Sequence, residues 1–384
     1  MTDDLETILA HDPVFAEHAV VPPLFQSSLF TFDTYEAMRA AFAGEVRRSV
    51  YSRVGNPTTA FFEAKLAALE GADAARGFAS GMAAISGAVL SVVRAGDRVV
   101  SVRHAYPDSY HFFEVLLPRL GVAVEYVDGR DLDALAKALP GARLLYLESP
   151  TSWVFETQEL EAVAALARAE GVVTVIDNSW ATPVFQNPLR HGIDLVLHSA
   201  SKYLSGHSDT VAGVVCGRHE LMEQMGRTVV PYLGGKLAPF EAWLLVRGLR
   251  TLAVRMREQE RRGLAVARRL AEHPRVERVL HPALEGRVDG VQLRGSSSLF
   301  SVELDGAIDV RAFCDALRLF RLGVSWGGHE SLVVPAAIAL EQAAGPNSVK
   351  DFGIGPRIVR LHIGLESVED LVADLEGAFA AAAC

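Results

Sequence analysis

Short apolar runs alternate with amphipathic, helix-like stretches along the middle of the chain, and this alternation restricts the possible folds more than any other feature. The runs are "DRVVSV", "GVAVEYVD", "ARLLYLESP", "GVVTVIDNS", "DLVLHS" and "VAGVVCG". Between them lie stretches such as "QELEAVAALARAEG", whose apolar residues recur at helical spacing. Near-continuous apolar strands separated by helices predict an α/β fold with a mainly parallel sheet covered on both faces.

The pattern divides the 384 residues into three predicted regions. Residues 1–50 are Pro-rich and extended in character, which suggests an N-terminal arm that packs on a neighbouring subunit. Residues 51–245 contain the alternating runs and form the predicted large domain. Residues 246–384 form a smaller α/β domain with strands "SLFSVEL" and "RIVRLHIGL". The stretch "LLVRGLRTLAVRMREQERRGLAVARRLAEH", which leads into it, is interpreted as one long helix.

Charge, hydropathy and cysteine spacing exclude several functional classes. A formal net charge of −10 argues against nucleic-acid binding, which requires clustered Lys and Arg. No apolar run approaches the roughly 20 residues of a membrane-spanning helix, so no membrane partner is expected. Cys216, Cys314 and Cys384 are too far apart in the sequence to form a metal-binding pair, and no metal site is predicted. The acidic start "MTDDLETILAHD" does not resemble a signal peptide, and a cytoplasmic location is expected.

Polar residues follow several of the predicted strands, where sites of α/β sheets usually lie. Ser80 and Gly81 begin a helix-like run, which suits an anion but is alone an ordinary helix cap. Asp177 ends one apolar run, where a bare carboxylate is costly to bury. Lys202 follows another run, and a desolvated lysine at that place can act as nucleophile and base. Arg53, in "YSRVGNPTT", is suited to bidentate phosphate binding.

An anion cradle, a strand-end carboxylate and a strand-end lysine in this order are typical of a site for pyridoxal 5′-phosphate. The cradle holds the phosphate, Asp177 keeps the pyridine nitrogen protonated, and Lys202 binds the aldehyde covalently. Each piece alone has a more ordinary explanation, and only the combination favours the cofactor.

The chain resembles the Cys/Met-metabolism family of pyridoxal-phosphate enzymes of fold type I. The resemblance runs from "PPLFQSS" to "RLHIGLESVEDLVADL" through "YSRVGNPT", "ASGMAA", "VIDNSWATP", "SASKYLSGHSD" and "LLVRGLRTL". It implies a mainly parallel seven-stranded sheet flanked by helices. It also implies amino-acid substrates and a homo-oligomer, in which dimers share their active sites and pair into the tetramer common in this family.

The resemblance also implies roles for individual residues. Lys202 is expected to be the cofactor-binding lysine and the catalytic base, with Tyr106 and Tyr51 as further catalytic candidates. The expected cofactor contacts are Lys202, Asp177, Ser80, Gly81, Met82, Ser199, Ser201, Tyr106, Tyr51 and Arg53, of which Tyr51 and Arg53 would come from the adjacent subunit. The expected substrate contacts are Arg360, Trp326, Ser325 and Ser152, with Arg360 gripping the α-carboxylate. His207 and His329 have a catalytic and a structural interpretation, of which we prefer the structural one, and the same holds for His111 and Tyr110.

Within the family, Trp326 in "VSWGGHESL" and Ser152 in "LESPTS" are most similar to bacterial cystathionine β-lyases, although "AYPDSYHFFE" departs from their pattern. The expected reaction is therefore α,β-elimination of L-cystathionine, or of related cysteine S-conjugates, to homocysteine, pyruvate and ammonia. The alternative is γ-elimination or γ-replacement, as in cystathionine γ-lyase, γ-synthase or methionine γ-lyase. A third possibility is a cofactor-binding regulator that has lost catalysis, against which the presence of Lys202, Asp177 and Arg360 argues.

Overall fold

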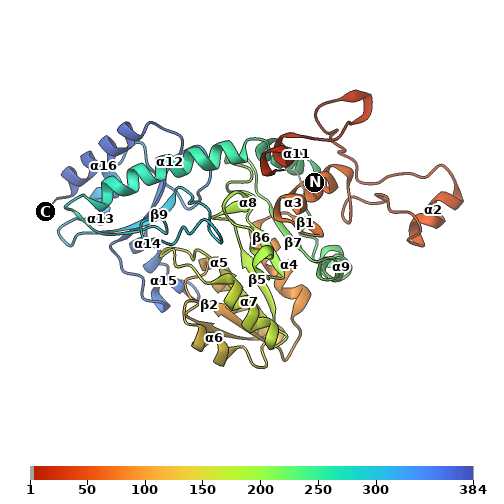
Figure 1. The fold of residues 1–384 in the computed structure, drawn as a ribbon, viewed down its shortest axis with the longest axis horizontal. Coiled ribbons are helices and arrows are strands. Elements are labelled where there is room, and N and C mark those ends of the chain that lie inside the picture. The colour runs from red at the N-terminus through yellow and green to blue at the C-terminus, as the bar shows by residue number, and fades with distance from the viewer. Residues whose placement is uncertain (1–3, 384) are drawn as a thin grey trace.

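The computed structural model of the chain describes residues 4–383, which fold around two β-sheets (Figure 1). The first sheet has seven strands in the order β1-β7-β6-β5-β4-β2-β3. These are β1 (Ala74–Phe78), β2 (Arg98–Val102), β3 (Ala123–Val127), β4 (Leu144–Glu148), β5 (Val173–Asp177), β6 (Leu195–His198) and β7 (Gly213–Gly217). Strand β7 runs antiparallel to both of its neighbours, and the other pairs are parallel. This confirms the predicted mainly parallel seven-stranded sheet.

Helices cover both faces of the first sheet, which explains why its strands are apolar throughout. On one face, Ile85 of α4 (Gly81–Val92) belongs to a buried cluster with Val175 and Leu197. On the other face, Val163 of α7 (Leu160–Ala169) and Leu135 of α6 (Leu132–Ala138) are buried with Ile176 and its neighbours. Helix α3 (Pro57–Glu70) packs beside β1 and β7.

The second sheet lies in the C-terminal part of the chain and has the order β10-β11-β12-β9-β8. Its strands are β8 (Val276–Leu280), β9 (Leu299–Leu304), β10 (Arg321–Leu322), β11 (Leu332–Pro335) and β12 (Ile358–His362). Phe313 of α13 (Val310–Ala316) and Phe379 of α16 (Val368–Ala382) are buried with the apolar face of this sheet. The smaller C-terminal α/β unit is thus confirmed.

The segment interpreted from the sequence as one long helix is two helices, α11 (Pro239–Leu249) and α12 (Leu252–Ala271), so that prediction is wrong. The backbone leaves helical geometry at Thr251, with φ −109° and ψ 8°. The buried guanidinium of Arg255 donates to the carbonyl of Gly248 at 2.8 Å, and its Nε donates to Thr251 Oγ1 at 3.2 Å. Side-chain bonds therefore replace helical ones at the break, which apolar periodicity cannot reveal.

The N-terminal segment, with α1 (Leu5–Ala10) and α2 (Tyr35–Phe42), includes a stretch that extends away from the body of the molecule (Figure 1). Several of its large apolar side chains are exposed, including Leu29, Tyr35 and Phe42. Its role as an arm, like the division at residues 50 and 245, stays a prediction. The remaining α-helices are α5 (Pro107–His111), α8 (Thr182–Phe185), α9 (His219–Thr228), α10 (Val230–Leu233), α14 (Ala336–Leu340) and α15 (Ser348–Asp351). Across residues 4–383, no helix combines the length and apolar character that crossing a membrane requires.

Candidate active site

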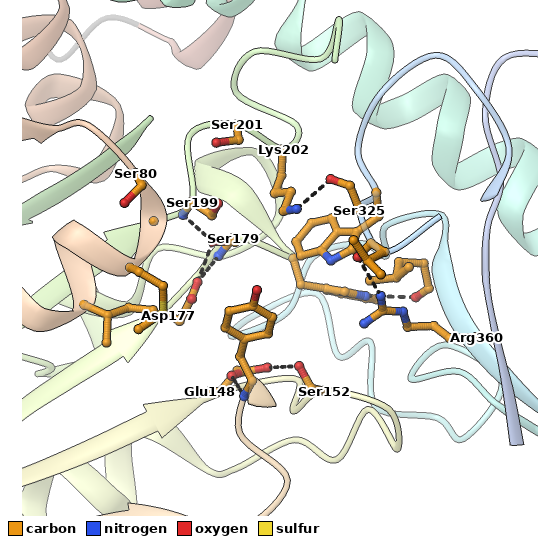
Figure 2. Close-up of a pocket in the computed structure, with 18 of the residues that line it drawn as sticks. Ser80, Glu148, Ser152, Asp177, Ser179, Ser199, Ser201, Lys202, Ser325 and Arg360 are labelled. Carbon is orange, nitrogen blue, oxygen red and sulfur yellow. Dashed lines mark hydrogen bonds between the residues drawn. The ribbon is translucent and has the colours of Figure 1, made fainter. Parts of the chain in front are cut away.

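A cavity of about 630 Å³ lies at the carboxyl ends of β4, β5 and β6 (Figure 2). The loop before β11 and the side chain of Arg360 on β12 contribute another part of its wall. The predicted site residues that line it are Ser80, Gly81, Met82, Tyr106, Ser152, Asp177, Ser199, Ser201, Lys202, Ser325, Trp326 and Arg360. This volume is typical of a small-molecule site, and its position follows the rule for open α/β sheets.

Lys202 lies on the loop that follows β6, and its Nζ points into the cavity (Figure 2). Nζ donates a hydrogen bond to Ser325 Oγ at 2.6 Å and lies 5.4 Å from the centre of the Trp326 ring. Burial, together with the positive charge of Arg360, lowers the pKa of Lys202 to about 8. About a tenth of the amine is therefore neutral at pH 7, far more than for an ordinary lysine, and available as nucleophile and base.

Asp177 is the last residue of β5, and its side chain lines the same cavity. Its Oδ1 accepts hydrogen bonds from the backbone N–H and the hydroxyl of Ser179, at 2.9 and 2.5 Å. The Ser179 hydroxyl also accepts from the N–H of Ser199 at 2.6 Å, which joins the ends of β5 and β6. Burial raises the pKa of Asp177, while the Ser179 hydrogen bonds and the nearby His198 and Lys202 oppose that rise.

Glu148 is a buried carboxyl of the cavity that the sequence analysis missed. It ends β4 directly beside Asp177 in the parallel register, so both side chains face the same side. Its Oε2 accepts from the N–H of Tyr106 and its Oε1 from the Ser152 hydroxyl, each at 2.7 Å. Burial and the neighbouring Asp177 raise the pKa of Glu148 to about 8. Glu148 in "LLYLES" also ends an apolar run, so the argument that identified Asp177 would have identified Glu148 as well. Ser179, two residues after Asp177, has no comparable feature in the sequence.

One end of the cavity is built for an anion. The Ser80 hydroxyl caps α4 by accepting from Ala83 N–H at 3.0 Å. Within the described residues, the N–H groups of Gly81 and Met82 have no hydrogen-bond acceptor, and both residues line the cavity. A Cβ on Gly81 would lie 2.7 Å from Ser199 Oγ, so only glycine permits this close approach. Open N–H groups at the start of a helix favour a phosphate.

The opposite wall carries a buried cation. Arg360 lies on β12, donates to the carbonyl of Val324 at 3.2 Å and stands 5.1 Å from the centre of the Trp153 ring. Burial lowers its pKa only to about 10, so the guanidinium remains charged near neutral pH. Ser325, on the loop before β11, lies on the same side of the cavity (Figure 2), and Trp326, the next residue, also lines it. A charged guanidinium in this wall suits a carboxylate ligand.

Tyr106 caps the start of α5 and stands over the cavity. Its hydroxyl donates to Asp108 Oδ2 at 2.5 Å, and its N–H is held by Glu148. Burial, together with the Asp108 hydrogen bond, raises the pKa of the phenol well above its ordinary value. Tyr106 is therefore held in its neutral form, with its ring free to stack on a ligand.

Tyr51 and Arg53 do not lie in this cavity within the single chain. They line a separate surface hollow with Lys236 and Gly234, and Arg53 Nη1 donates to the carbonyl of Pro231 at 2.7 Å. This placement leaves their predicted role as contributions from an adjacent subunit untested.

The stretch "SGHSD" is divided between structural and cavity-facing residues. His207 Nδ1 lies 2.6 Å from the carbonyl of Ser205, outside the residues that line the cavity. Ser208 and Asp209 do line it, and the Ser208 hydroxyl donates to Glu330 Oε1 at 2.6 Å. Across residues 4–383, no group of three His, Cys, Asp or Glu side chains has the arrangement of a metal site.

The residues fit pyridoxal 5′-phosphate. The cavity combines a lysine with a lowered pKa, a buried strand-end carboxylate and open N–H groups beside a glycine that leaves no room for a side chain. These would hold the aldehyde, the pyridine nitrogen and the phosphate, while the guanidinium of Arg360 stays available for a substrate carboxylate.

Comparison with known proteins assigns the family. Residues 6–380 match the family described as "Cys/Met metabolism PLP-dependent enzyme", so the chain belongs to this family and its cofactor is pyridoxal 5′-phosphate. The chain is 38% identical over 380 residues to an L-methionine gamma-lyase of Pseudomonas putida, covering 97% of this chain and 96% of that protein.

Solved structures agree with the fold and the cofactor. A cystathionine gamma synthase of Xanthomonas oryzae pv. oryzae is 35% identical with a TM-score of 0.92, covering 99% of this chain and 98% of the other. A structure described as an O-acetylhomoserine (thiol)-lyase of Campylobacter jejuni, with N′-pyridoxyl-lysine-5′-monophosphate, is 27% identical with a TM-score of 0.93, covering 98% and 100%. None of these three relatives is named as a β-lyase. The similarity to bacterial cystathionine β-lyases that Trp326 and Ser152 predicted is therefore not supported.

Proposed function

We propose that this member of the Cys/Met metabolism family catalyses γ-elimination on sulfur-containing amino acids, with L-methionine as the type substrate. The reaction takes up water and gives a thiol, 2-oxobutyrate and ammonia. The observation that supports it is the similarity, along nearly the whole chain, to a methionine γ-lyase. This replaces β-elimination of cystathionine as the preferred reaction. The γ-synthase relative makes γ-replacement at the same carbon the related possibility.

Lys202 is the proposed proton carrier of this reaction. Pyridoxal phosphate supplies, when bound, an electron-withdrawing ring that stabilises negative charge on the substrate carbons. As a free amine, Lys202 Nζ would be the base that acts on the substrate. Its pKa of about 8 lets it take the proton from Cα and the second proton from Cβ that γ-elimination requires. The hydrogen bond to Ser325 Oγ holds Nζ on the side of the cavity where Arg360 binds the substrate carboxylate.

The other residues hold the reactants. Asp177 would keep the pyridine nitrogen protonated, and Ser199 and Ser201, with the N–H groups of Gly81 and Met82, would bind the phosphate. Tyr106 would cover the ring, held by its backbone contact with Glu148. This arrangement excludes water from the ring face and leaves the side of Lys202 open to the substrate.

A shared active site completes the proposal. Tyr51 and Arg53 would reach the phosphate in the adjacent subunit, because their own chain places them in a separate surface hollow. A homodimer is then the smallest active unit, and two such dimers would form the family's usual tetramer.

A second candidate function is β-elimination of cystathionine or of cysteine S-conjugates. Trp326 is the residue that suggests it, because its similarity to the tryptophan of bacterial cystathionine β-lyases falls on a ring that lines the cavity 5.4 Å from Lys202 Nζ. It uses the same cofactor contacts and the same base but requires a single proton abstraction, at Cα.

Product analysis separates these reactions. The purified enzyme is incubated with L-methionine, L-cystathionine, L-cystine and O-succinylhomoserine, and the keto acid is identified. The proposal predicts 2-oxobutyrate from methionine and cystathionine. Pyruvate from cystathionine or cystine, without 2-oxobutyrate from any substrate, would support β-elimination instead. The absence of any keto acid in a preparation that binds the cofactor would favour a catalytically inactive regulator.

A further inference from the structure

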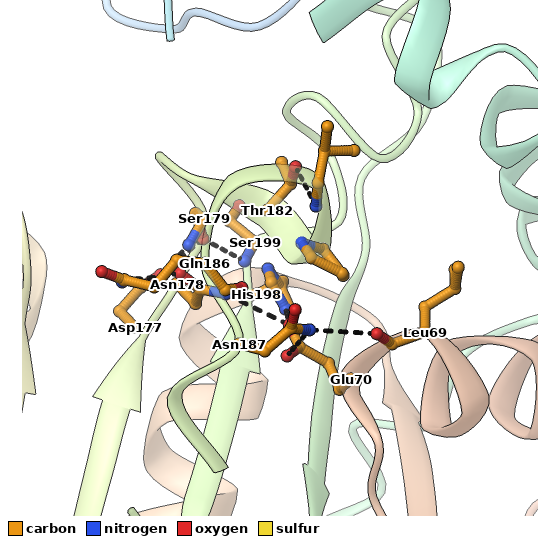
Figure 3. A network of polar contacts seen from close by, with 12 residues as sticks. Leu69, Glu70, Asp177, Asn178, Ser179, Thr182, Gln186, Asn187, His198 and Ser199 are labelled. Carbon is orange, nitrogen blue, oxygen red and sulfur yellow. Dashed lines mark hydrogen bonds and ion pairs between the residues drawn. The ribbon is translucent and has the colours of Figure 1, made fainter. Parts of the chain in front are cut away.

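A cluster of buried polar side chains lies behind the cavity, on the other side of the first sheet (Figure 3). Its centre is Glu70, the last residue of α3, and His198, the last residue of β6. Both side chains are fully buried, and His198 Nε2 lies 2.6 Å from Glu70 Oε1. None of the roles proposed above uses this pair.

The carboxyl group of Glu70 is held by two buried amides as well as by His198. Besides His198, Asn178 Nδ2 donates to Oε1 at 3.2 Å and Asn187 Nδ2 to Oε2 at 3.4 Å. Gln186 extends the cluster through its Nε2, which donates to Asn178 Oδ1 at 3.0 Å and to the carbonyl of Ser149 at 2.9 Å. A buried carboxylate is tolerated only with such partners.

The cluster therefore holds the carboxyl ends of three adjacent strands. Ser149 directly follows β4, Asn178 directly follows β5, and His198 ends β6. The backbone N–H of Asn178 also donates to the carbonyl of Leu197 at 2.9 Å. These are the strand ends that carry the cofactor contacts.

The side chains of neighbouring residues point to opposite faces of the sheet. Asp177 and Ser199 line the cavity, whereas Asn178 and His198, their neighbours in sequence, reach the cluster around Glu70 (Figure 3). A displacement of Asn178 or His198 on one face therefore moves Asp177 or Ser199 on the other. His198 also acts through charge, since it is among the groups that oppose the rise in the pKa of Asp177.

We propose that the Glu70–His198 pair is a positioning element of the cofactor site, which sets where Asp177 and Ser199 stand by fixing the strand ends from the opposite face of the sheet. A buried hydrogen-bonded polar pair adds little stability over an apolar cluster of equal volume, but its directional contacts favour one arrangement. The inference rests on the proposed cofactor contacts of Asp177 and Ser199, and it does not depend on which carbon–sulfur bond the enzyme cleaves.

The test uses Glu70→Gln, Glu70→Asp and His198→Gln. The Gln variants replace a titratable side chain by a neutral amide, and Glu70→Asp keeps the carboxyl group but withdraws it by one bond length, roughly 1.5 Å. The matched control is Thr174→Val. Thr174 is also buried on β5, and its hydroxyl contacts Asp194 at 2.9 Å, just before β6, at the end of the strands far from the cavity.

Three quantities are measured for each variant: the dissociation constant of pyridoxal phosphate from the apoenzyme, the pH titration of the visible absorbance of the holoenzyme, and the thermal unfolding of the apoenzyme. The positioning role predicts a cofactor affinity lower by about ten- to hundredfold, the usual cost of losing a residue that orients a binding group. It also predicts an altered absorbance titration. Thr174→Val should lower the unfolding temperature without changing either cofactor readout.

The proposal is overturned if the Glu70 and His198 variants behave like Thr174→Val, losing stability while cofactor affinity and absorbance titration stay at their wild-type values. Glu70→Asp, which preserves the buried carboxyl group, supplies this comparison should a Gln variant fail to fold. Asp177→Asn serves as a reference. If it leaves the absorbance titration unchanged, the role assigned to Asp177 fails, whatever the Glu70 variants show.

Discussion

Nζ of Lys202 and Oγ of Ser325 lie 2.6 Å apart, although 123 positions separate the two residues in the chain. Lys202 belongs to the loop after β6 of the first sheet, and Ser325 to the loop before β11 of the second. The contact joins the residues proposed to hold the cofactor to those proposed to face the substrate. Both sheets are therefore needed to build one cavity.

Replacing Lys202 by Ala should abolish the visible absorbance of the covalently bound cofactor and the release of keto acid, because Lys202 carries the one amine that lines the cavity among residues 4–383. Absorbance spectroscopy of the purified variant with added pyridoxal phosphate provides the measurement. Lys137→Ala, at an exposed position on α6, should leave the spectrum unchanged. A visible band that persists in Lys202→Ala would show that another group binds the aldehyde.

Association of the cofactor with the apoenzyme should accelerate as pH rises through about 8. Burial first, and then the charge of Arg360, lowers the pKa of Lys202 to that value from 10.5, and only the neutral amine attacks an aldehyde. The rate constant, measured by stopped-flow absorbance, should level off above this pH. Arg360→Leu removes the neighbouring positive charge and should move the midpoint to higher pH. A wild-type midpoint near 10.5 would contradict the lowered pKa.

The Glu148→Gln apoenzyme should be more stable than the wild type, and the difference in the free energy of unfolding should grow as pH rises from about 4.5 to 8. In the folded wild type the carboxyl keeps its proton up to a pKa of about 8, whereas the unfolded chain loses it near 4.5. Because the folded state then holds more protons, its stability falls as pH rises through this window, and Gln has no proton to lose. Denaturant unfolding at a series of pH values gives the free energies. Parallel curves for the two proteins would argue that Glu148 is ionised when folded.

Arg360→Lys should lower kcat/KM for amino-acid substrates by about 10- to 100-fold, the loss expected when a charge-assisted bidentate contact is weakened. The corresponding amines, which lack the α-carboxylate, should be processed equally by both enzymes. Arg357→Lys, three residues earlier at the surface beside Glu277, is the control and should retain wild-type kinetics. Equal losses with amines and amino acids would mean that Arg360 does not bind the carboxylate.

Co-expression of Lys202→Ala and Arg53→Ala chains should restore activity that neither variant has alone. If Arg53 serves the neighbouring subunit, a mixed dimer contains one intact site, and random pairing gives about a quarter of wild-type activity. The pair Lys202→Ala and Asp177→Ala is the control. Both residues belong to the cavity of one chain, so every site in that mixture is defective. No recovery with Arg53→Ala would place Arg53 outside the shared site.

The sequence located the strands well because their apolar runs are continuous and buried on both faces. Lys202, Asp177 and the start of α4 could be brought together from sequence since parallel strands end at one edge of the sheet. The break at Thr251 was missed because it depends on side-chain bonds from Arg255. The Glu70–His198 pair spans 128 positions and has no local pattern, so only the folded chain reveals it.

The reaction type was the least predictable property. Trp326 and Ser152 suggested β-elimination, whereas the relatives by name are a γ-lyase and a γ-synthase. The two proposed reactions use the same cofactor, the same proposed base and the same proposed carboxylate contact. They differ in whether a second proton is taken from Cβ, so the residues assigned to these roles do not distinguish them.

The walls of the cavity come from two sheets, and this affects how such an enzyme can evolve. Ser325 and Trp326 belong to a loop of the second sheet, while Asp177 and Ser199 belong to the first. After a gene duplication, substitutions in that loop alter the room beside the reacting amine while the anchoring strand ends remain intact. New substrate preferences can therefore arise in single steps, without passing through an ancestor that has lost its cofactor.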